Sequence, residues 1–285
     1  MRRLIVGCGY LGARVARAWR DAGDQVYATT RGAQVEALSG AGFQPLILDV
    51  TAAPVLRVLP DVDTVLFAVA RARNSDATMF DIHVAGLRAV LDALPAPASR
   101  VIYVSTTGVY GQDRGEWVDE ASVTEPLREG GQACLAAEGV LFGHERGRDG
   151  VVLRMAGLYG TGRIPRADDV LQGQTIAGSP DAYLNLIHVD DAARAVVAAG
   201  DPAHGGGKTY VVSDSCPPTR GEYVAEVASR LGRTVPPFSG GSGRGKRVRS
   251  TRIVRTLDLQ LKYRSFREGL AASCPDTASR VRDPL

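Results

Sequence analysis

Residues 4–12 read LIVGCGYLG, a short apolar run that leads into three glycines with the spacing GxGxxG. Residues 11–23 follow with apolar side chains at helical spacing and a glycine at the end, a pattern that predicts an amphipathic helix. A glycine-rich turn between a strand and a helix brings backbone N–H groups and the positive end of the helix dipole to one point. The stretch therefore predicts a binding site for the pyrophosphate of a dinucleotide.

The three glycines have different tasks in such a turn. Gly7 allows the tight turn, Gly9 lets the backbone approach the pyrophosphate, and Gly12 lets the helix pack closely on the strand. We expect Tyr10 and Leu11, which lie between them, to contact the bound nucleotide as well.

Apolar runs alternate with helical patterns along the rest of the chain. Nearly continuous apolar runs suit parallel strands that are buried on both faces. Their alternation with helices predicts an α/β fold, a Rossmann-type doubly wound parallel sheet with right-handed crossovers. The predicted strands are 4–7, 25–30, 45–50, 63–70, 100–106 and 150–156, and the predicted helices are 11–23, 35–42 and the segment around 80–94.

Composition excludes several classes of protein. The chain has 285 residues, 45% of them hydrophobic, and no run approaches the roughly 20 apolar residues that a membrane span needs. The apolar run after the first arginines is too short for a signal peptide. The four cysteines are far apart, with no CxxC pair and no cluster of histidines. We therefore expect a cytoplasmic protein without a metal site, a disulfide framework or a membrane partner.

One segment is strongly basic. Residues 240–255 hold six of the 34 basic residues, directly after a glycine-rich loop. Such a segment could contact phosphate or nucleic acid, but it has no interleaved aromatic residues and leads into a predicted helix. We interpret it as a solvated loop and expect no nucleic-acid partner.

The end of the second predicted strand indicates which dinucleotide binds. A site for NAD places Asp or Glu there to accept hydrogen bonds from the ribose, whereas this chain reads Ala-Thr-Thr-Arg over 28–31, with no carboxylate before Glu36. Arg31 can pair with the 2′-phosphate of NADP and stack on adenine, and Thr30 can add a hydroxyl donor. We predict NADP(H), with NAD(H) as the alternative.

Four motifs carry a resemblance to a known family. Residues 104–111 read VSTTGVYG, 153–163 read LRMAGLYGTGR, and 185–193 read NLIHVDDAA. These segments, together with the ending over 246–270, resemble the extended and atypical short-chain dehydrogenases/reductases, the NAD(P)-dependent epimerase/dehydratase group. The resemblance covers nearly the whole chain. It is specific for the superfamily and says little about the reaction.

The resemblance implies further cofactor contacts and a division of the chain. Asp49 and Val50 match the family's adenine-binding pair, and Ala68, Val69 and Ala70 end a strand where backbone passes the cofactor ribose. By its position on a strand, Ser105 is expected to face the same pocket. The Rossmann domain is expected over 1–155 with about 184–200, and a small discontinuous substrate-binding lobe over 156–183 and 201–285.

The family's catalytic pattern is incomplete. Thr106, four residues before Tyr110, matches the Ser/Thr that holds the substrate oxygen, and Tyr110 is a second candidate for the chemistry. Family members also have a Tyr-x-x-x-Lys pair, in which the lysine and the cofactor lower the phenol pKa. In this chain Gly130 stands at the tyrosine position and Cys134 at the lysine position, and no Tyr-x-x-x-Lys occurs anywhere.

Two functions remain open at this point. The first is an atypical NADP-dependent oxidoreductase or epimerase that acts on a small-molecule substrate, for which Arg163 and Arg166 could meet an anionic group. The second is a non-catalytic sensor or regulatory protein that binds NADP(H). By analogy with extended relatives, a homodimer through helices around 80–94 and 130–144 is expected.

Overall fold

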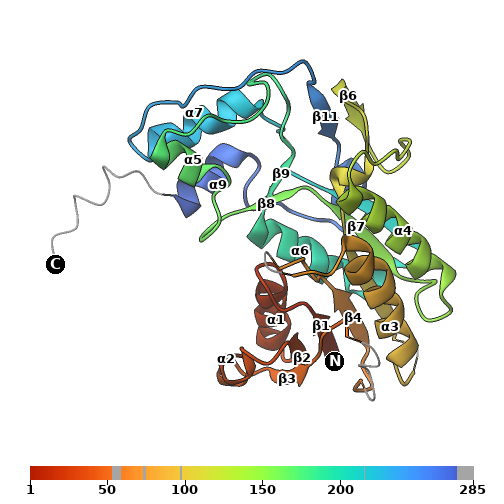
Figure 1. Ribbon diagram of the computed structural model, residues 1–285. Coiled ribbons are helices and arrows are strands. Elements are labelled where there is room, and N and C mark those ends of the chain that lie inside the picture. The colour runs from red at the N-terminus through yellow and green to blue at the C-terminus, as the bar shows by residue number, and fades with distance from the viewer. Residues whose placement is uncertain (53–58, 73–74, 97, 215, 275–285) are drawn as a thin grey trace, which may run out of the picture.

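A seven-stranded parallel sheet forms the centre of the molecule. The computed structural model describes residues 1–52, 59–72, 75–96, 98–214 and 216–274. The strands pair in the order β10-β7-β5-β4-β1-β2-β3, so that the order reverses between β1 and β4 (Figure 1). This is the predicted Rossmann-type α/β fold. The strands are β1 (Arg2–Val6), β2 (Gln25–Thr30), β3 (Gln44–Ile47), β4 (Thr64–Phe67), β5 (Arg100–Thr106), β7 (Val151–Met155) and β10 (Lys208–Val212).

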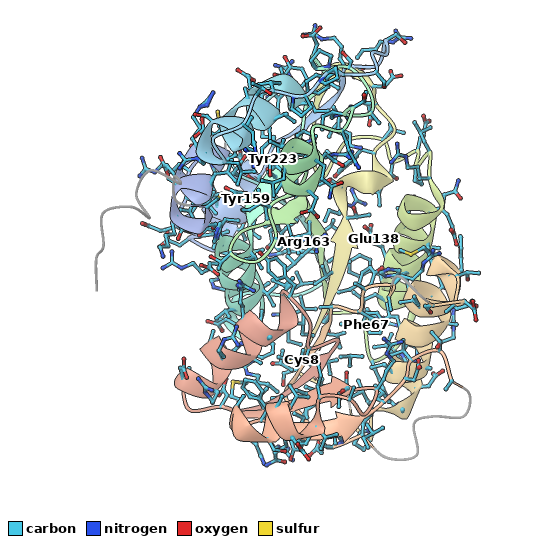
Figure 2. All side chains as sticks on the ribbon, turned by 60° about the vertical axis from the view of Figure 1, so that its left-hand side comes forward. Cys8, Phe67, Glu138, Tyr159, Arg163 and Tyr223 are labelled. Atoms are coloured by element: carbon cyan, nitrogen blue, oxygen red, sulfur yellow. The ribbon has the colours of Figure 1, made fainter. Side chains whose placement is uncertain are left out.

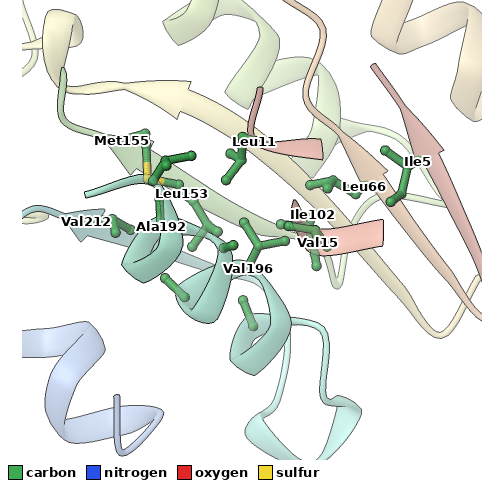
Figure 3. Packing of buried hydrophobic residues seen from close by; sticks show 14 of the residues in the cluster. Ile5, Leu11, Val15, Leu66, Ile102, Leu153, Met155, Ala192, Val196 and Val212 are labelled. Atoms are coloured by element: carbon green, nitrogen blue, oxygen red, sulfur yellow. The ribbon is translucent and has the colours of Figure 1, made fainter. Parts of the chain in front are cut away.

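Helices cover both faces of the sheet because the strands are apolar on both sides. On one face α1 (Gly12–Asp21) and α6 (Val189–Ala199) pack against residues such as Ile102 and Leu153 (Figure 3). On the other face lie α3 (Gly86–Ala93) and α4 (Glu129–Gly143). The predicted helix around 80–94 is divided, since its first part is a π-helical turn, η1 (Asp81–Ala85). The short α2 (Val35–Gly40) packs on β3.

A smaller lobe lies at the opposite end of the molecule from β1–β3 (Figure 1). Its core is formed by Tyr159, Val170, Tyr223, Phe266 and other buried side chains. The lobe contains α5 (Ala167–Gln172), α7 (Arg220–Arg230), α9 (Phe266–Ser273) and the paired strands β8 (Gly157–Tyr159) and β9 (Leu186–His188). The remaining elements are η2 (Thr107–Val109), η3 (Pro202–His204), α8 (Thr251–Thr256) and the parallel pair β6 (Arg114–Val118) and β11 (Gly245–Val248).

One strand of the central sheet was not expected there. β10 pairs with β7 at the edge of the sheet, although we placed residues after 200 in the smaller lobe. The apolar run that forms it is only Tyr210–Val212, all three residues being buried. A run of three apolar residues is too short to predict a strand from the sequence. The segment is a strand because it pairs with β7. Residues 275–285, also placed in that lobe, lie outside the described residues.

None of the helices in the described ranges is long and apolar enough to cross a bilayer. Within the same ranges there is no group of three or more His, Cys, Asp or Glu side chains that could hold a metal ion. None of the four cysteines is in a disulfide.

Candidate functional site

The glycine-rich loop follows β1 at the point where the strand order reverses. Gly7 has a φ of 97°, and a Cβ atom there would lie 2.6 Å from the carbonyl oxygen of Ala68, which directly follows the neighbouring strand β4. A Cβ at Gly12 would collide with the carbonyl oxygen of Gly7. Both glycines are therefore required by the fold itself. A Cβ at Gly9 would meet nothing within 4 Å, so Gly9 faces open space, as expected if the loop is shaped around a ligand.

A cavity of about 480 Å³ opens in front of this loop. It lies at the carboxyl ends of β1, β2, β3 and β4, where open α/β sheets bind ligands. Most of the predicted cofactor residues line it: Gly7, Gly9, Tyr10, Leu11, Thr30, Arg31, Asp49, Val50, Ala68, Val69 and Ala70. Gly12 does not line the cavity but packs against the backbone of Gly7 in the glycine-rich loop.

The far end of the cavity has the polar groups expected around an adenosine. Arg31 is exposed directly after β2, and the hydroxyl of Thr30 accepts the N–H of Gly32 at 3.2 Å. Asp49 accepts hydrogen bonds from the backbone N–H and the hydroxyl of Thr51 at 2.9 and 2.7 Å. These bonds, and to a lesser degree the positive charge of Arg31, hold the pKa of the Asp49 carboxyl below its usual value.

Sequence reasoning missed several residues at the other end of the cavity. Val104, Leu158 and Ile82 give that end an apolar wall, and Arg163 reaches the cavity from the smaller lobe. Arg163 lies over the ring of Tyr10, 5.7 Å from its centre, and both Arg163 and Cys8 of the glycine-rich loop can be found in Figure 2. We had considered Arg163 only for a substrate. Strand alternation could have identified Val104, since it points opposite to Ser105.

Ser105 does not face the cavity, which corrects our prediction. It is buried on the opposite side of β5, and its hydroxyl donates to Oε1 of Glu138 on α4 at 2.6 Å. Arg154 on β7 donates to the same carboxylate through Nε at 3.0 Å and Nη2 at 2.7 Å. Ser105 and Thr106 are neighbours on one strand and point to opposite faces, so they cannot both face the cavity, as we predicted.

Tyr110 belongs to the same buried network and is also absent from the cavity wall. Its side chain is 2% exposed, and its hydroxyl accepts a hydrogen bond from Nη1 of Arg154 at 2.9 Å. Burial raises the pKa of this phenol. A phenol that is enclosed, bonded to an arginine and hard to ionise is poorly placed for proton transfer to a ligand, so we assign Tyr110 a structural role in place of the predicted catalytic one.

Thr106, the other predicted catalytic residue, is also not among the residues that line the cavity, although it lies next to them. It ends β5 two residues after Val104, so the two side chains lie on the same face of the strand. Its Oγ1 accepts the backbone N–H of Gly108 at 3.0 Å, which orients the hydroxyl. In the described residues this hydroxyl donates no hydrogen bond to the protein, and its proton is therefore available to a substrate oxygen.

The first turns of α4 hold Gly130 and Cys134, which stand at the family's tyrosine and lysine positions. A Cβ at Gly130 would lie 3.5 Å from the terminal methyl of Met79, so an apolar side chain borders the space where a phenol would project. Cys134 is 4% exposed among apolar side chains, and burial raises the pKa of its thiol to about 11. A thiol with this pKa stays protonated at neutral pH and does not replace the ammonium group of a lysine.

His188 has a structural role, as we expected for its motif. Its Nδ1 accepts the backbone N–H of Asp190 at 3.2 Å and caps α6, and its Nε2 lies 2.9 Å from the hydroxyl of Ser273 on α9. The ring packs between Tyr159 and Tyr263, with ring centres 5.3 and 4.2 Å away. His188 thus joins the smaller lobe to the central domain.

Comparisons with known proteins agree with this geometry. The model of the NAD dependent epimerase/dehydratase family matches residues 4–213. A candidate NAD-dependent epimerase/dehydratase from Methylobacillus flagellatus is 29% identical, with a TM-score of 0.76 and 99% of each chain covered. A conserved protein of unknown function from Silicibacter pomeroyi is 27% identical, with the same TM-score and the same coverage of each chain.

More distant structures share the fold. UDP-glucuronic acid 4-epimerase from Bacillus cereus, solved in complex with NAD, is 18% identical, with a TM-score of 0.80 over 99% of this chain and 100% of that one. A comparison with curated proteins found no match.

Proposed function

The chain belongs to the NAD-dependent epimerase/dehydratase family, and from that premise we propose that it is an NADP-dependent oxidoreductase or epimerase acting on a small-molecule substrate. The observation that carries this proposal is the cavity beside the glycine-rich loop, with Arg31 at one end and an apolar wall, close to Thr106, at the other. Bound there, a nicotinamide cofactor supplies or accepts hydride. The residues of the chain bind it, orient the substrate and exclude water.

The preference for NADP over NAD rests on the charges at the end of β2. No carboxylate lies at this point of the described chain, and Arg31 is exposed at the rim of the cavity. A 2′-phosphate would form charge-assisted hydrogen bonds with this guanidinium, whereas the 2′-hydroxyl of NAD would lack the acidic partner that it usually has. Asp49, after the neighbouring strand β3, is close enough to interact with the charge of Arg31, but among the described residues its carboxylate accepts hydrogen bonds from Thr51 and not from Arg31.

Thr106 is proposed to hold the oxygen of the reacting carbonyl or alcohol. Because Gly108 satisfies one lone pair of the hydroxyl, the hydroxyl proton can point to the substrate. Val104, Leu158 and Ile82 would exclude water from the reacting carbon. With Gly130 and Cys134 in place of the usual pair, water or a nearby side chain would complete the proton transfer.

A second function is favoured by one observation, the side chains at the start of α4. Gly130 is bordered by Met79, and Cys134 is a protonated thiol in an apolar cluster. A protein that binds NADP(H) as a sensor or regulatory partner needs the cavity but does not need a catalytic tyrosine and lysine on α4. Turnover distinguishes the two functions.

Cofactor choice is tested by titrating the protein with NADPH and with NADH and following nucleotide fluorescence. We expect tighter binding of NADPH and an Arg31→Ala variant that binds NADPH about tenfold to a hundredfold more weakly, since charge-assisted hydrogen bonds contribute about 1.5–3 kcal/mol. Binding of NADH should hardly change. Tighter binding of NADH, unaffected by Arg31→Ala, would refute the assignment.

Turnover is tested by stopped-flow absorbance of bound NADPH against a panel of carbonyl compounds. Oxidation that is lost in Thr106→Val and kept in Thr234→Val, a change at an exposed threonine, would support the enzyme. Tight binding of NADPH without oxidation across the panel would support the sensor.

We also propose a homodimer formed through α3 and α4. The outer face of α4 exposes small side chains, including Ala136, Gly139 and Gly143, so a second helix can approach closely. Light scattering at micromolar concentration measures the mass, and a monomer would exclude this proposal.

A further inference from the structure

Five side chains stack on one another over the small sheet formed by β6 and β11. The guanidinium of Arg247 lies over two rings, 4.8 Å from the centre of Trp117 and 4.9 Å from that of Tyr183. Arg249 lies 5.5 Å from the centre of the Trp117 ring, and Arg244 lies 5.6 Å from that of Tyr183. Cations and rings therefore alternate in the order Arg249, Trp117, Arg247, Tyr183, Arg244. We call these five side chains the arginine–aromatic ladder.

The pairing of β6 with β11 puts part of the ladder on one face of the small sheet. Arg247 is the partner of Trp117 in the register. The backbone N–H of Arg249 donates to the carbonyl oxygen of Val118 at 2.9 Å, so the pairing continues past the end of β11. Arg249 lies two residues after Arg247 and therefore points to the same side. Val248, between them, points into the molecule and is 2% exposed.

Tyr183 reaches the same face from the segment before β9. Its backbone N–H donates to the carbonyl oxygen of Arg244 at 2.7 Å, which holds this segment beside β11. Gly115 on β6 leaves room for the ring, since a Cβ there would lie 3.2 Å from Cε2 of Tyr183. Residues 240–255 contain no aromatic residue, which was our reason for interpreting them as a solvated loop. The fold supplies the two rings from other parts of the chain.

The three arginines of the ladder form no ion pair with the described residues. Arg3, Arg14 and Arg20 also lie over aromatic rings, but each of them is paired with an aspartate. Glu116 on β6 points to the other face of the strand, and its Oε2 accepts the backbone N–H of Arg114 at 2.7 Å. The ladder therefore combines uncompensated positive charge with the faces of aromatic rings.

The ladder is open to solvent and separate from the dinucleotide cavity. Trp117 is 43% exposed, although tryptophan is usually well buried, and Arg244 and Arg249 are exposed as well. None of the five ladder residues lines the cavity. β6 and β11 lie at the end of the molecule opposite to α2 and β3 (Figure 1). An exposed indole between unpaired cations adds little to the core, and its position favours a bound partner.

We propose that the arginine–aromatic ladder binds a single-stranded nucleic acid, a function that goes beyond the proposed one and does not depend on it. Guanidinium groups whose planes rest on rings keep their N–H edges for phosphate oxygens. Unpaired bases stack on aromatic rings and on guanidinium planes. A duplex encloses the faces of its bases, and an acidic peptide would need the charges but not the rings. The alternation of charges and rings therefore favours a single strand.

Fluorescence anisotropy of a labelled oligouridylate of about 12 nucleotides measures binding to the full chain at several salt concentrations. A duplex RNA of the same length and a labelled polyglutamate peptide are titrated in the same way. Each titration is repeated with saturating NADP⁺, which blocks the dinucleotide cavity. Tryptophan emission is a second readout. The chain has two tryptophans and Trp19 is 2% exposed, so quenching by the oligonucleotide reports stacking on Trp117.

The informative variant is the double substitution Arg244→Gln/Arg249→Gln, which removes two exposed charges of the ladder. The double substitution Arg148→Gln/Arg233→Gln, at exposed positions outside the ladder, changes the net charge equally and is the matched control. We expect the affinity of the wild type for the oligouridylate to fall with salt. Each phosphate contact on a single strand contributes about 0.7 to the slope of log K against log salt, so the ladder variant should lower that slope by about 1.4 and the control should not change it. Trp117→Leu should weaken binding at least fivefold and keep the slope.

No binding of the oligouridylate at low salt, or the same affinity and slope in the ladder variant and the control, would overturn the proposal. Binding of the duplex or of polyglutamate as tight as that of the oligouridylate would also overturn it, because the rings would then have no part in recognition. Loss of binding under saturating NADP⁺ would place the oligonucleotide in the dinucleotide cavity instead. If NADP⁺ does not bind but the ladder-dependent binding persists, the proposed function fails and this inference stands.

Discussion

Arg154→Met tests how much the buried network behind β5 stabilises the fold. Arg154 donates to Glu138 through two nitrogens, at 3.0 and 2.7 Å, and to the hydroxyl of Tyr110 at 2.9 Å. The side chains of Arg154 and Glu138 are 9% and 6% exposed. Methionine is of similar length and apolar, so the substitution removes the charge and the hydrogen bonds while it keeps most of the packing.

The expected loss in the free energy of unfolding follows from the hydrogen bonds that Glu138 keeps when Arg154 is replaced. Without Arg154, its carboxylate keeps a single bond, from the hydroxyl of Ser105 at 2.6 Å, in a site nearly closed to water. Removal of one member of a buried ion pair costs about 3–5 kcal/mol, because the other charge is left uncompensated. The additional change Glu138→Leu removes that charge, so the double variant should recover about 2 kcal/mol or more relative to Arg154→Met.

Urea unfolding at pH 7, followed by fluorescence and circular dichroism, measures Arg154→Met, Glu138→Leu, the double variant and the wild type. Arg2→Met, which removes an ion pair to Asp61 at the surface, is the control and should leave stability within experimental error. A loss below about 1 kcal/mol for Arg154→Met, or a double variant whose loss equals the sum of the single losses, would refute the reasoning.

Three further expectations can be checked separately. Gly9→Ala should leave the melting temperature unchanged, as should the control Gly40→Ala, yet weaken NADPH binding at least tenfold, because its Cβ would meet only the ligand; unchanged binding would contradict this. Burial raises the pKa of Asp214 to about 8, so between about pH 4 and pH 8 the folded chain keeps a proton that the unfolded chain has released. In this range the group lowers the free energy of unfolding by about 1.4 kcal/mol for each unit by which the pH rises. Asp214→Asn should remove this pH dependence, which urea unfolding of the variant and the wild type at pH 5.5 and 7.5 measures. The same change in stability between the two pH values in both proteins would count against it. A thiol reagent at pH 7 should label the exposed Cys216 quickly and Cys134 only after unfolding, and fast labelling of both would show that Cys134 is accessible.

Much of the fold and the cofactor end of the site could be predicted because their signals are local. The spacing of Gly7, Gly9 and Gly12 between a strand and a helix depends on backbone geometry within nine residues, and the structure forms the loop as expected. β2 and β5 begin and end where the apolar runs over 25–30 and 100–106 do. Arg31 and Asp49 follow strands directly, so knowing the strands was enough to place them at the cavity.

Apart from Thr106, the end of the cavity near β5 was decided by tertiary structure. Hydrogen bonds join Arg154 to Tyr110 over 44 residues and Lys246 to the carbonyl of Tyr110 over 136 residues, and no periodicity in the sequence records such pairs. Motif position suggested a catalytic Tyr110, whereas its contact with Arg154 makes it structural. Sequence by itself determined the backbone conformation that receives a dinucleotide, since that depends on neighbouring residues. Tertiary packing determined which side chains can interact with a ligand. The fold decides whether a hydroxyl or a charged group is already hydrogen-bonded to a partner from elsewhere in the chain.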